Sequence, residues 1–102
     1  MLTNRYPEIA ETFFTKGVAQ LRDGNRLEAI ANFDRVLQFA PNNADAYGHR
    51  CVARHRAGDL QGAISDCQRA ATLYQEQRNI KSYQYALKML DKLEAMSTPA
   101  RD

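Results

Sequence analysis

The amino-acid sequence predicts an all-α fold, and three features of the chain favour it. Ala, Leu, Gln, Glu, Arg and Lys, all good helix formers, dominate the 102 residues. Only 5 Gly and 3 Pro are present, which is few for a chain built from many short strands. Apolar residues recur at spacings of three and four, the period of an amphipathic helix. A chain of this length holds one modest core, so we expect a single domain over residues 1–102.

The first two helices are predicted over Pro7–Arg22 and Arg26–Phe39. Pro7 suits the first turn of a helix, where a missing N–H costs nothing. The sequence Asp-Gly-Asn around Gly24 is typical of a helix stop, a turn and a cap, and the glycine allows a left-handed backbone. Pro41 ends the second helix.

The other three helices are predicted over Ala44–Arg56, Leu60–Gln77 and Ile80–Met96. Asn42 and Asn43 are caps for the third helix, and Asp59, after the turn at Gly58, is the N-cap of the fourth. Gln75 stands where a proline would match Pro41, so the fourth helix should run further than the second. We expect the tail from Ser97 to Asp102 to be frayed.

The chain repeats itself with a period of 34 residues. Eight of the 34 aligned positions are identical: Ala10/Ala44, Val18/Val52, Ala19/Ala53, Arg22/Arg56, Gly24/Gly58, Ala29/Ala63, Ile30/Ile64 and Arg35/Arg69. We therefore predict a first repeat over 10–43, a second over 44–77 and a capping helix over 80–96. Neither hairpin can bury its apolar face alone, so the two hairpins must stack.

These residues resemble the tetratricopeptide repeat (TPR) family. The small or aromatic positions of the family fall on Phe13, Gly17, Ala19, Gly24, Ala29, Phe33, Val36 and Pro41, and then on Tyr47, Cys51, Ala53, Gly58, Ala63, Cys67 and Ala70. The resemblance covers residues 10–77 and implies a right-handed superhelical stack of two helix-turn-helix hairpins with a C-terminal solvating helix. The departures are Lys16 and Arg50 where the family prefers Leu, Cys51 for Gly, and the missing proline at Gln75.

Signatures of catalysis are absent from the sequence, so we expect neither an enzyme nor a cofactor. There is no P-loop, GxSxG, HExxH or CxxC motif. His49 and His55 lie about 240° apart around a helix and do not share a face, which argues against a metal site. Cys51 and Cys67 occupy small inward positions of one hairpin; they are expected to behave as small hydrophobes, with a disulfide as the alternative.

The family resemblance implies that the first helix of each repeat lines a concave face where peptides bind. The predicted binding residues are Phe14, Val18, Leu21, Arg22, His49, Val52, His55, Arg56 and Tyr83. This surface is apolar on one side and basic on the other, which suits a protein or peptide partner with an apolar anchor and an acidic group. The positions of the chaperone-binding carboxylate clamp hold Phe14, Val18, His49, Asn79 and Tyr83, none of which matches, so chaperone C-terminal tails are not expected as ligands.

The net charge and the apolar segments of the sequence argue against a nucleic-acid partner, a membrane span and a secretory signal. A net charge of +2 is weak evidence for a nucleic-acid partner. The basic residues between positions 49 and 56 have acidic residues close to them in the sequence, namely Asp45, Asp59 and Asp66. No stretch is long and apolar enough to span a membrane, and the N-terminus lacks the pattern of a secretory signal. We expect a non-catalytic adaptor or assembly factor in the cytoplasm, in a bacterial or organellar setting. The alternative is a structural segment that self-associates as a homo-oligomer or belongs to a longer TPR array.

Overall fold

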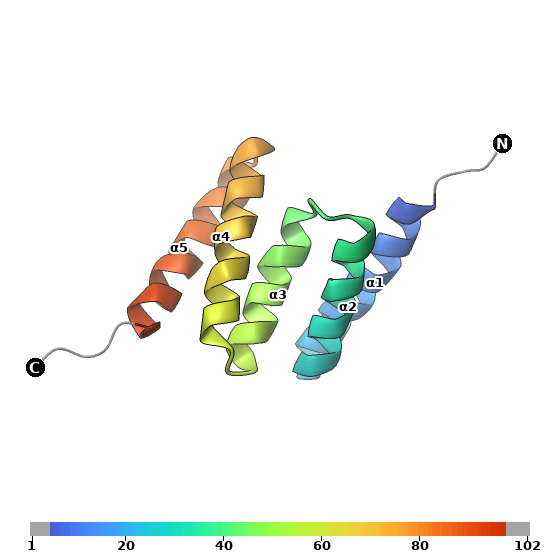
Figure 1. Cartoon of the computed structure of the whole chain (residues 1–102), viewed down its shortest axis with the longest axis horizontal. Coiled ribbons are helices and arrows are strands. Elements are labelled where there is room, and N and C mark those ends of the chain that lie inside the picture. Colours follow the sequence, from blue (N-terminus) through green and yellow to red (C-terminus); the bar gives the residue numbers. More distant parts are fainter. Residues whose placement is uncertain (1–4, 98–102) are drawn as a thin grey trace, which may run out of the picture.

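A computed structural model describes residues 5–97, and these residues form five α-helices and no strand. The helices are α1 (Tyr6–Arg22), α2 (Arg26–Phe39), α3 (Ala44–Arg56), α4 (Leu60–Glu76) and α5 (Ile80–Ser97). The helices follow one another along the molecule, with α1 and α2 at one end and α4 and α5 at the other; α1 lies behind α2, and α5 partly behind α4 (Figure 1). The predicted all-α stack is confirmed, and every helix boundary lies within one residue of its predicted place. Of the tail expected to fray, Ser97 is the last residue of α5 and 98–102 lie outside the described residues.

Side-chain caps begin the last three helices. Asn43 Oδ1 accepts the backbone N–H of Ala46 at 3.0 Å, and Asp59 Oδ1 accepts that of Gly62 at 2.9 Å. At the start of α5, Asn79 Oδ1 accepts the N–H of Ser82 at 3.2 Å. Each cap satisfies a donor that the first helical turn leaves without an intrahelical partner.

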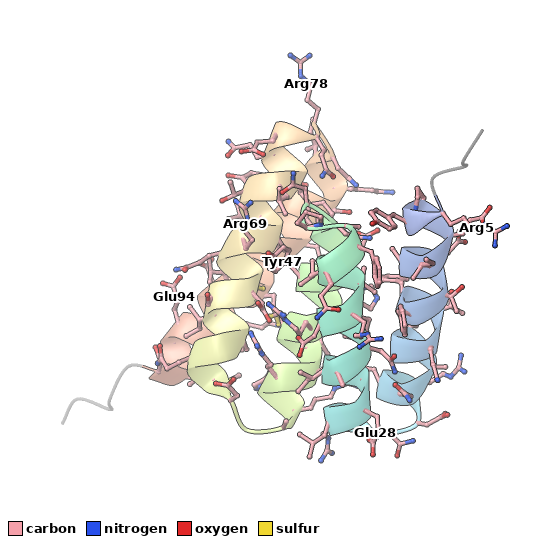
Figure 2. All side chains as sticks on the ribbon, turned by 45° about the vertical axis from the view of Figure 1, so that its right-hand side comes forward. Arg5, Glu28, Tyr47, Arg69, Arg78 and Glu94 are labelled. Carbon is pink, nitrogen blue, oxygen red and sulfur yellow. The ribbon has the colours of Figure 1, made fainter. Side chains whose placement is uncertain are left out.

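One turn type is used three times along the chain. Gly24 between α1 and α2 and Gly58 between α3 and α4 have positive φ angles of 85° and 91°, as the sequence predicted. The α4–α5 turn repeats the same pattern of three backbone hydrogen bonds, but Arg78 occupies the left-handed position with φ 59°. The Arg78 side chain points away from the body of the molecule (Figure 2). The chain therefore turns from α4 into α5 as it turns within each repeat.

The first hairpin packs a glycine on its first helix against an aromatic ring on its second. Gly17 lies under the ring of Phe33, and a Cβ at Gly17 would come within 2.8 Å of that ring. The 34-residue repeat places Cys51 and Cys67 at the equivalent positions. Both thiols are buried, in a cluster that Leu93 of α5 completes. The α5 helix thus covers the second hairpin, as its predicted capping role requires.

A buried carboxylate ties α2, α3 and α4 together. Asp66 is 2% exposed and accepts hydrogen bonds from Arg50 at 2.7 and 2.9 Å and from Arg54 at 3.0 Å. Arg50 also reaches Asp34 of α2 at 2.8 Å. Burial lowers the pKa of Arg50, but its hydrogen bonds to Asp66 and Asp34 outweigh that effect and raise the pKa above its ordinary value. Arg50, a departure from the family pattern, is therefore a structural residue here.

Candidate functional site

The candidate site is a groove between α3 and α5, which both pack on α4. The groove has a volume of about 480 Å³. Its walls and floor are formed by Asp45, Gly48, His49 and Val52 of α3, Cys67 and Tyr74 of α4, and Lys81, Ser82, Tyr85, Ala86 and Met89 of α5. The lining is mainly apolar, and it carries one carboxylate and one ammonium group. In Figure 1 the α4 ribbon stands between those of α3 and α5, the two helices whose side chains form the walls of the groove.

Tyr74 makes a polar contact on the floor of the groove. The Tyr74 hydroxyl donates a hydrogen bond to the Asp45 carboxylate. Burial, followed by the contact with Asp45, raises the pKa of Tyr74 above its ordinary value, so the phenol stays protonated at neutral pH. Gly48 lies above this contact, where a Cβ would stand 3.6 Å from the Tyr74 oxygen. The absence of a side chain at Gly48 therefore leaves the middle of the groove open.

His49 connects the wall of the groove to the first hairpin. Its ring packs edge-on against Phe14 of α1, with centroids 5.1 Å apart, and lies 5.8 Å from the Phe33 ring. Its Nδ1 hydrogen-bonds the Asp45 carbonyl at 2.8 Å. These contacts fix the ring orientation, so His49 presents a defined surface to the groove.

The predicted binding residues of α1 lie outside this groove. Phe14 and Val18 are half-buried against the cluster that contains Phe33, and Leu21 is 7% exposed within that cluster. Arg22 is exposed at the end of α1, with its Nε 3.9 Å from an Asp23 carboxylate oxygen. Packing against neighbouring helices therefore takes up much of the surface of these apolar residues.

The predicted residues of α3 and α5 divide between the groove and its surroundings. His49 and Val52 line the groove, whereas His55 and the exposed Arg56 lie beyond it at the C-terminal end of α3. Tyr83 packs against the α4 cluster of Ala70, Ala71 and Tyr74 instead of lining the groove.

Sequence reasoning missed Tyr85 and Met89, which supply much of the α5 wall. The 34-residue shift carried His49 onto Tyr83, but α4 is three residues longer than α2, and α5 therefore does not follow that register. The spacing of four between Tyr85 and Met89 was the available signal, because it puts both side chains on one face of a helix.

The described residues give no support for a metal site or for a membrane-spanning helix. Within residues 5–97, no three His, Cys, Asp or Glu side chains are grouped so that they could hold a metal ion. Over the same residues no helix is long and apolar enough to cross a membrane. Cys51 and Cys67 are free thiols, and the pKa of Cys51 is raised by its hydrogen bond with Cys67 and by burial.

Comparisons with known proteins connect the chain to TPR proteins. Tetratricopeptide repeat protein 36 of Mus musculus is 36% identical over 58 residues, which are 57% of this chain and 31% of the mouse protein. The Homo sapiens protein of the same name is 34% identical over 58 residues, also 31% of its length. Protein FlbA of Caulobacter vibrioides is 34% identical over 64 residues, 63% of this chain and 11% of FlbA. The chain thus spans less than a third of the relatives it matches. No family model matches it.

Proposed function

We propose that this chain, a TPR-like helical repeat protein, binds a protein or peptide partner in the groove between α3 and α5. The observation that carries the proposal is the groove itself, an open and mainly apolar cavity of about 480 Å³. Tyr85 on its α5 wall is 66% exposed, although its ring is large and apolar. Rigid aromatic side chains at the edge of an apolar groove are favoured contact residues in protein interfaces.

The partner is proposed to insert an apolar side chain beside Val52 and Met89, which lie on opposite walls of the groove. Burial of that anchor should dominate the affinity, because exposed charge pairs contribute only about 0–1 kcal/mol each. Arg22 and Arg56 end the two first helices and are both exposed. They would steer an acidic group of the partner toward that end and set its orientation.

The role proposed is that of a non-catalytic adaptor or assembly factor. The one histidine of the groove holds its Nδ1 on a backbone carbonyl and its ring against Phe14, and the one thiol there, Cys67, is 3% exposed. Neither group is arranged as a nucleophile with a base beside it. These contacts support recognition of a partner and suggest no reaction.

Site-specific photo-crosslinking tests the proposal. A benzoylphenylalanine at Tyr85 should give a defined adduct with a partner in extracts of the source cells. The matched control places the same probe at Leu27, which is apolar and 73% exposed but lies on α2, outside the groove. The adduct should disappear when Met89→Glu is added. Equal adducts from both positions, or an adduct that survives Met89→Glu, would contradict binding in the groove.

Self-association is a second candidate function, favoured by exposed apolar residues of α5 that do not line the groove. Ile80 and Leu87 are 68% and 37% exposed and lie seven residues apart, on one face of the helix. Sedimentation of the chain over a range of concentrations tests this candidate. A homo-oligomer that Ile80→Glu dissociates would support it, and a monomer at every concentration would exclude it.

A further inference from the structure

A second cavity of about 440 Å³ lies at the other end of the first helices, between the start of α1, the end of α2 and the start of α3. It is lined by Tyr6, Pro7, Ala10, Glu11, Phe14, Phe39, Ala40, Asn43 and Asp45. Asp45 is the single residue that it shares with the α3–α5 groove. The two cavities therefore adjoin at Asp45 but have separate walls.

Aromatic rings form much of this second cavity. The Tyr6 and Phe39 rings meet at a tilt of 57° with their centroids 5.5 Å apart. Phe39 also stacks on Phe13, with centroids 6.2 Å apart. Phe13 already holds a cation, because the Arg35 guanidinium lies 5.2 Å from its centroid. Phe13 does not itself line the cavity, but its contact with Arg35 shows that a ring of this aromatic group accepts a guanidinium.

The charged groups of the cavity lining are both carboxylates. Glu11 comes from α1 and Asp45 from α3, and both residues are exposed. Within residues 5–97, no salt bridge joins Glu11 to a basic side chain. Arg5 stands just before α1, but its side chain points away from the molecule (Figure 2). The cavity is therefore apolar in its walls and negative at its rim.

We propose that this cavity binds an arginine or lysine side chain of the partner polypeptide, an inference that rests on the proposed function. Such a side chain has a methylene stem that packs on apolar walls and a cationic head that seeks polar partners. Here the rings of Tyr6 and Phe39 receive the stem, and Glu11 and Asp45 receive the head. A charge-assisted hydrogen bond to a carboxylate is stronger than a neutral one, and a ring beside the cation adds to the attraction.

The 34-residue repeat sets the distance between this cation site and the arginines at the other end of the first helices. Glu11 and Asp45 are equivalent residues of the two repeats, and so are Arg22 and Arg56. On α1, Glu11 and Arg22 are eleven residues apart, and on α3 so are Asp45 and Arg56. Eleven residues of helix span about 16 Å at 1.5 Å per residue. The first helices therefore carry acids at one end and arginines at the other. A partner that fits should carry a basic residue and an acidic residue about 16 Å apart, with an apolar anchor between them.

A titration with a minimal probe tests the cation site without the partner. The probe is Nα-acetyl-arginine methylamide, and its neutral isostere is Nα-acetyl-citrulline methylamide, both followed by amide chemical shifts of the 102-residue chain. The arginine probe should shift residues around Glu11, Phe39 and Asp45 with a dissociation constant in the millimolar range, and citrulline should not. Glu11→Gln should weaken binding about two- to fivefold, the range of an exposed charge pair.

The matched control is Glu8→Gln, which removes the same charge one turn earlier on α1 and does not line the cavity. It should bind the probe like the wild type, whereas the double variant Glu11→Gln/Asp45→Asn should lose binding. Equal binding of citrulline, an equal effect of Glu8→Gln, or no saturable shift would each overturn the cation site. If the Tyr85 crosslink nevertheless forms, only this inference fails and the groove proposal stands.

Discussion

Replacing Asp66 by alanine should destabilise the chain strongly, because it leaves two arginines without their main partner. Asp66 is 2% exposed and accepts three charge-assisted hydrogen bonds, between 2.7 and 3.0 Å long. Breaking a buried ion pair by removing one member costs about 3–5 kcal/mol. The arginines keep some compensation, since Arg50 retains Asp34 at 2.8 Å and Arg54 lies 3.8 Å from Asp59. We therefore expect a loss near the lower end, about 3 kcal/mol.

Urea denaturation followed by circular dichroism measures this loss. With a slope of about 1.5 kcal/mol/M for a chain of this size, the midpoint should fall by about 2 M urea. Asp34→Ala is the matched control: it removes a carboxylate of the same network whose side chain is 49% exposed, and it should cost below about 1 kcal/mol. Arg50→Leu combined with Asp66→Ala should cost less than the sum of the single changes, because the pair is coupled.

Two results would refute this reasoning about Asp66. If Asp66→Ala costs no more than Asp34→Ala, burial of the carboxylate does not matter to the stability of the fold. If the effects of Arg50→Leu and Asp66→Ala add, the two side chains do not act as one network. Either result would return Arg50 to the status of an ordinary departure from the family pattern.

Three further predictions follow from the turns, the groove floor and the thiols. Arg78→Gly should stabilise the chain by about 0.5–1 kcal/mol in urea denaturation because φ 59° strains a side chain, and Gly58→Ala should destabilise it by about 1–2 kcal/mol. The raised pKa of Tyr74 means that its contribution to stability is full below the ordinary tyrosine pKa of about 10 and declines above it, so stability should fall more steeply between about pH 9.5 and 11 in the wild type than in Tyr74→Phe. Cys51 and Cys67 should react with an aromatic disulfide reagent at least about tenfold more slowly in the folded chain than in urea, because both thiols are buried and the pKa of Cys51 is raised.

The helices and the turns between them could be predicted because their signals are local. Gly24 and Gly58 stand where the backbone needs a positive φ, and Pro41 and Asp59 mark a helix end and a helix start. Backbone geometry of this kind depends on a few neighbouring residues and is visible in one sequence. The place of the third turn was predicted, but its left-handed residue was not, because Arg78 carries no glycine signal; the surrounding hairpin imposes its left-handed conformation.

The groove was harder to predict because it depends on the register of α5. The predicted residues His49 and Val52 belong to the groove, since the repeat fixes the register of α3. The extension of α4 to Glu76 changes the relation of α5 to the repeat, so Tyr83 packs inward and Tyr85 reaches the groove. The α5 helix begins two positions later than a shift of 34 residues from the start of α3, and two positions turn a helix by about 200°, which is enough to exchange a packed face for an open one.

The departures from the family pattern are better understood as pairs than as single residues. Cys51 in place of glycine looks like a defect, but its neighbour across the hairpin is Cys67, where the first repeat has Phe33 against Gly17. A larger residue on one helix is matched by a smaller one on the other, which keeps the interior filled.

The polar contacts of the two hairpins follow the same rule. In the first repeat the Asn32 amide donates to Gln20, and in the second the equivalent positions hold Asp66 and Arg54, joined by an ion pair. A neutral pair and an ionic pair thus occupy the same place, and each satisfies its own polar groups, which are half-buried in the first repeat and include the buried Asp66 in the second. Arg50 belongs with the ionic version, because a carboxylate that is 2% exposed needs more than one cation to hold its charge. Comparing positions across the hairpin, instead of one position at a time with a family pattern, would have predicted this network from the sequence.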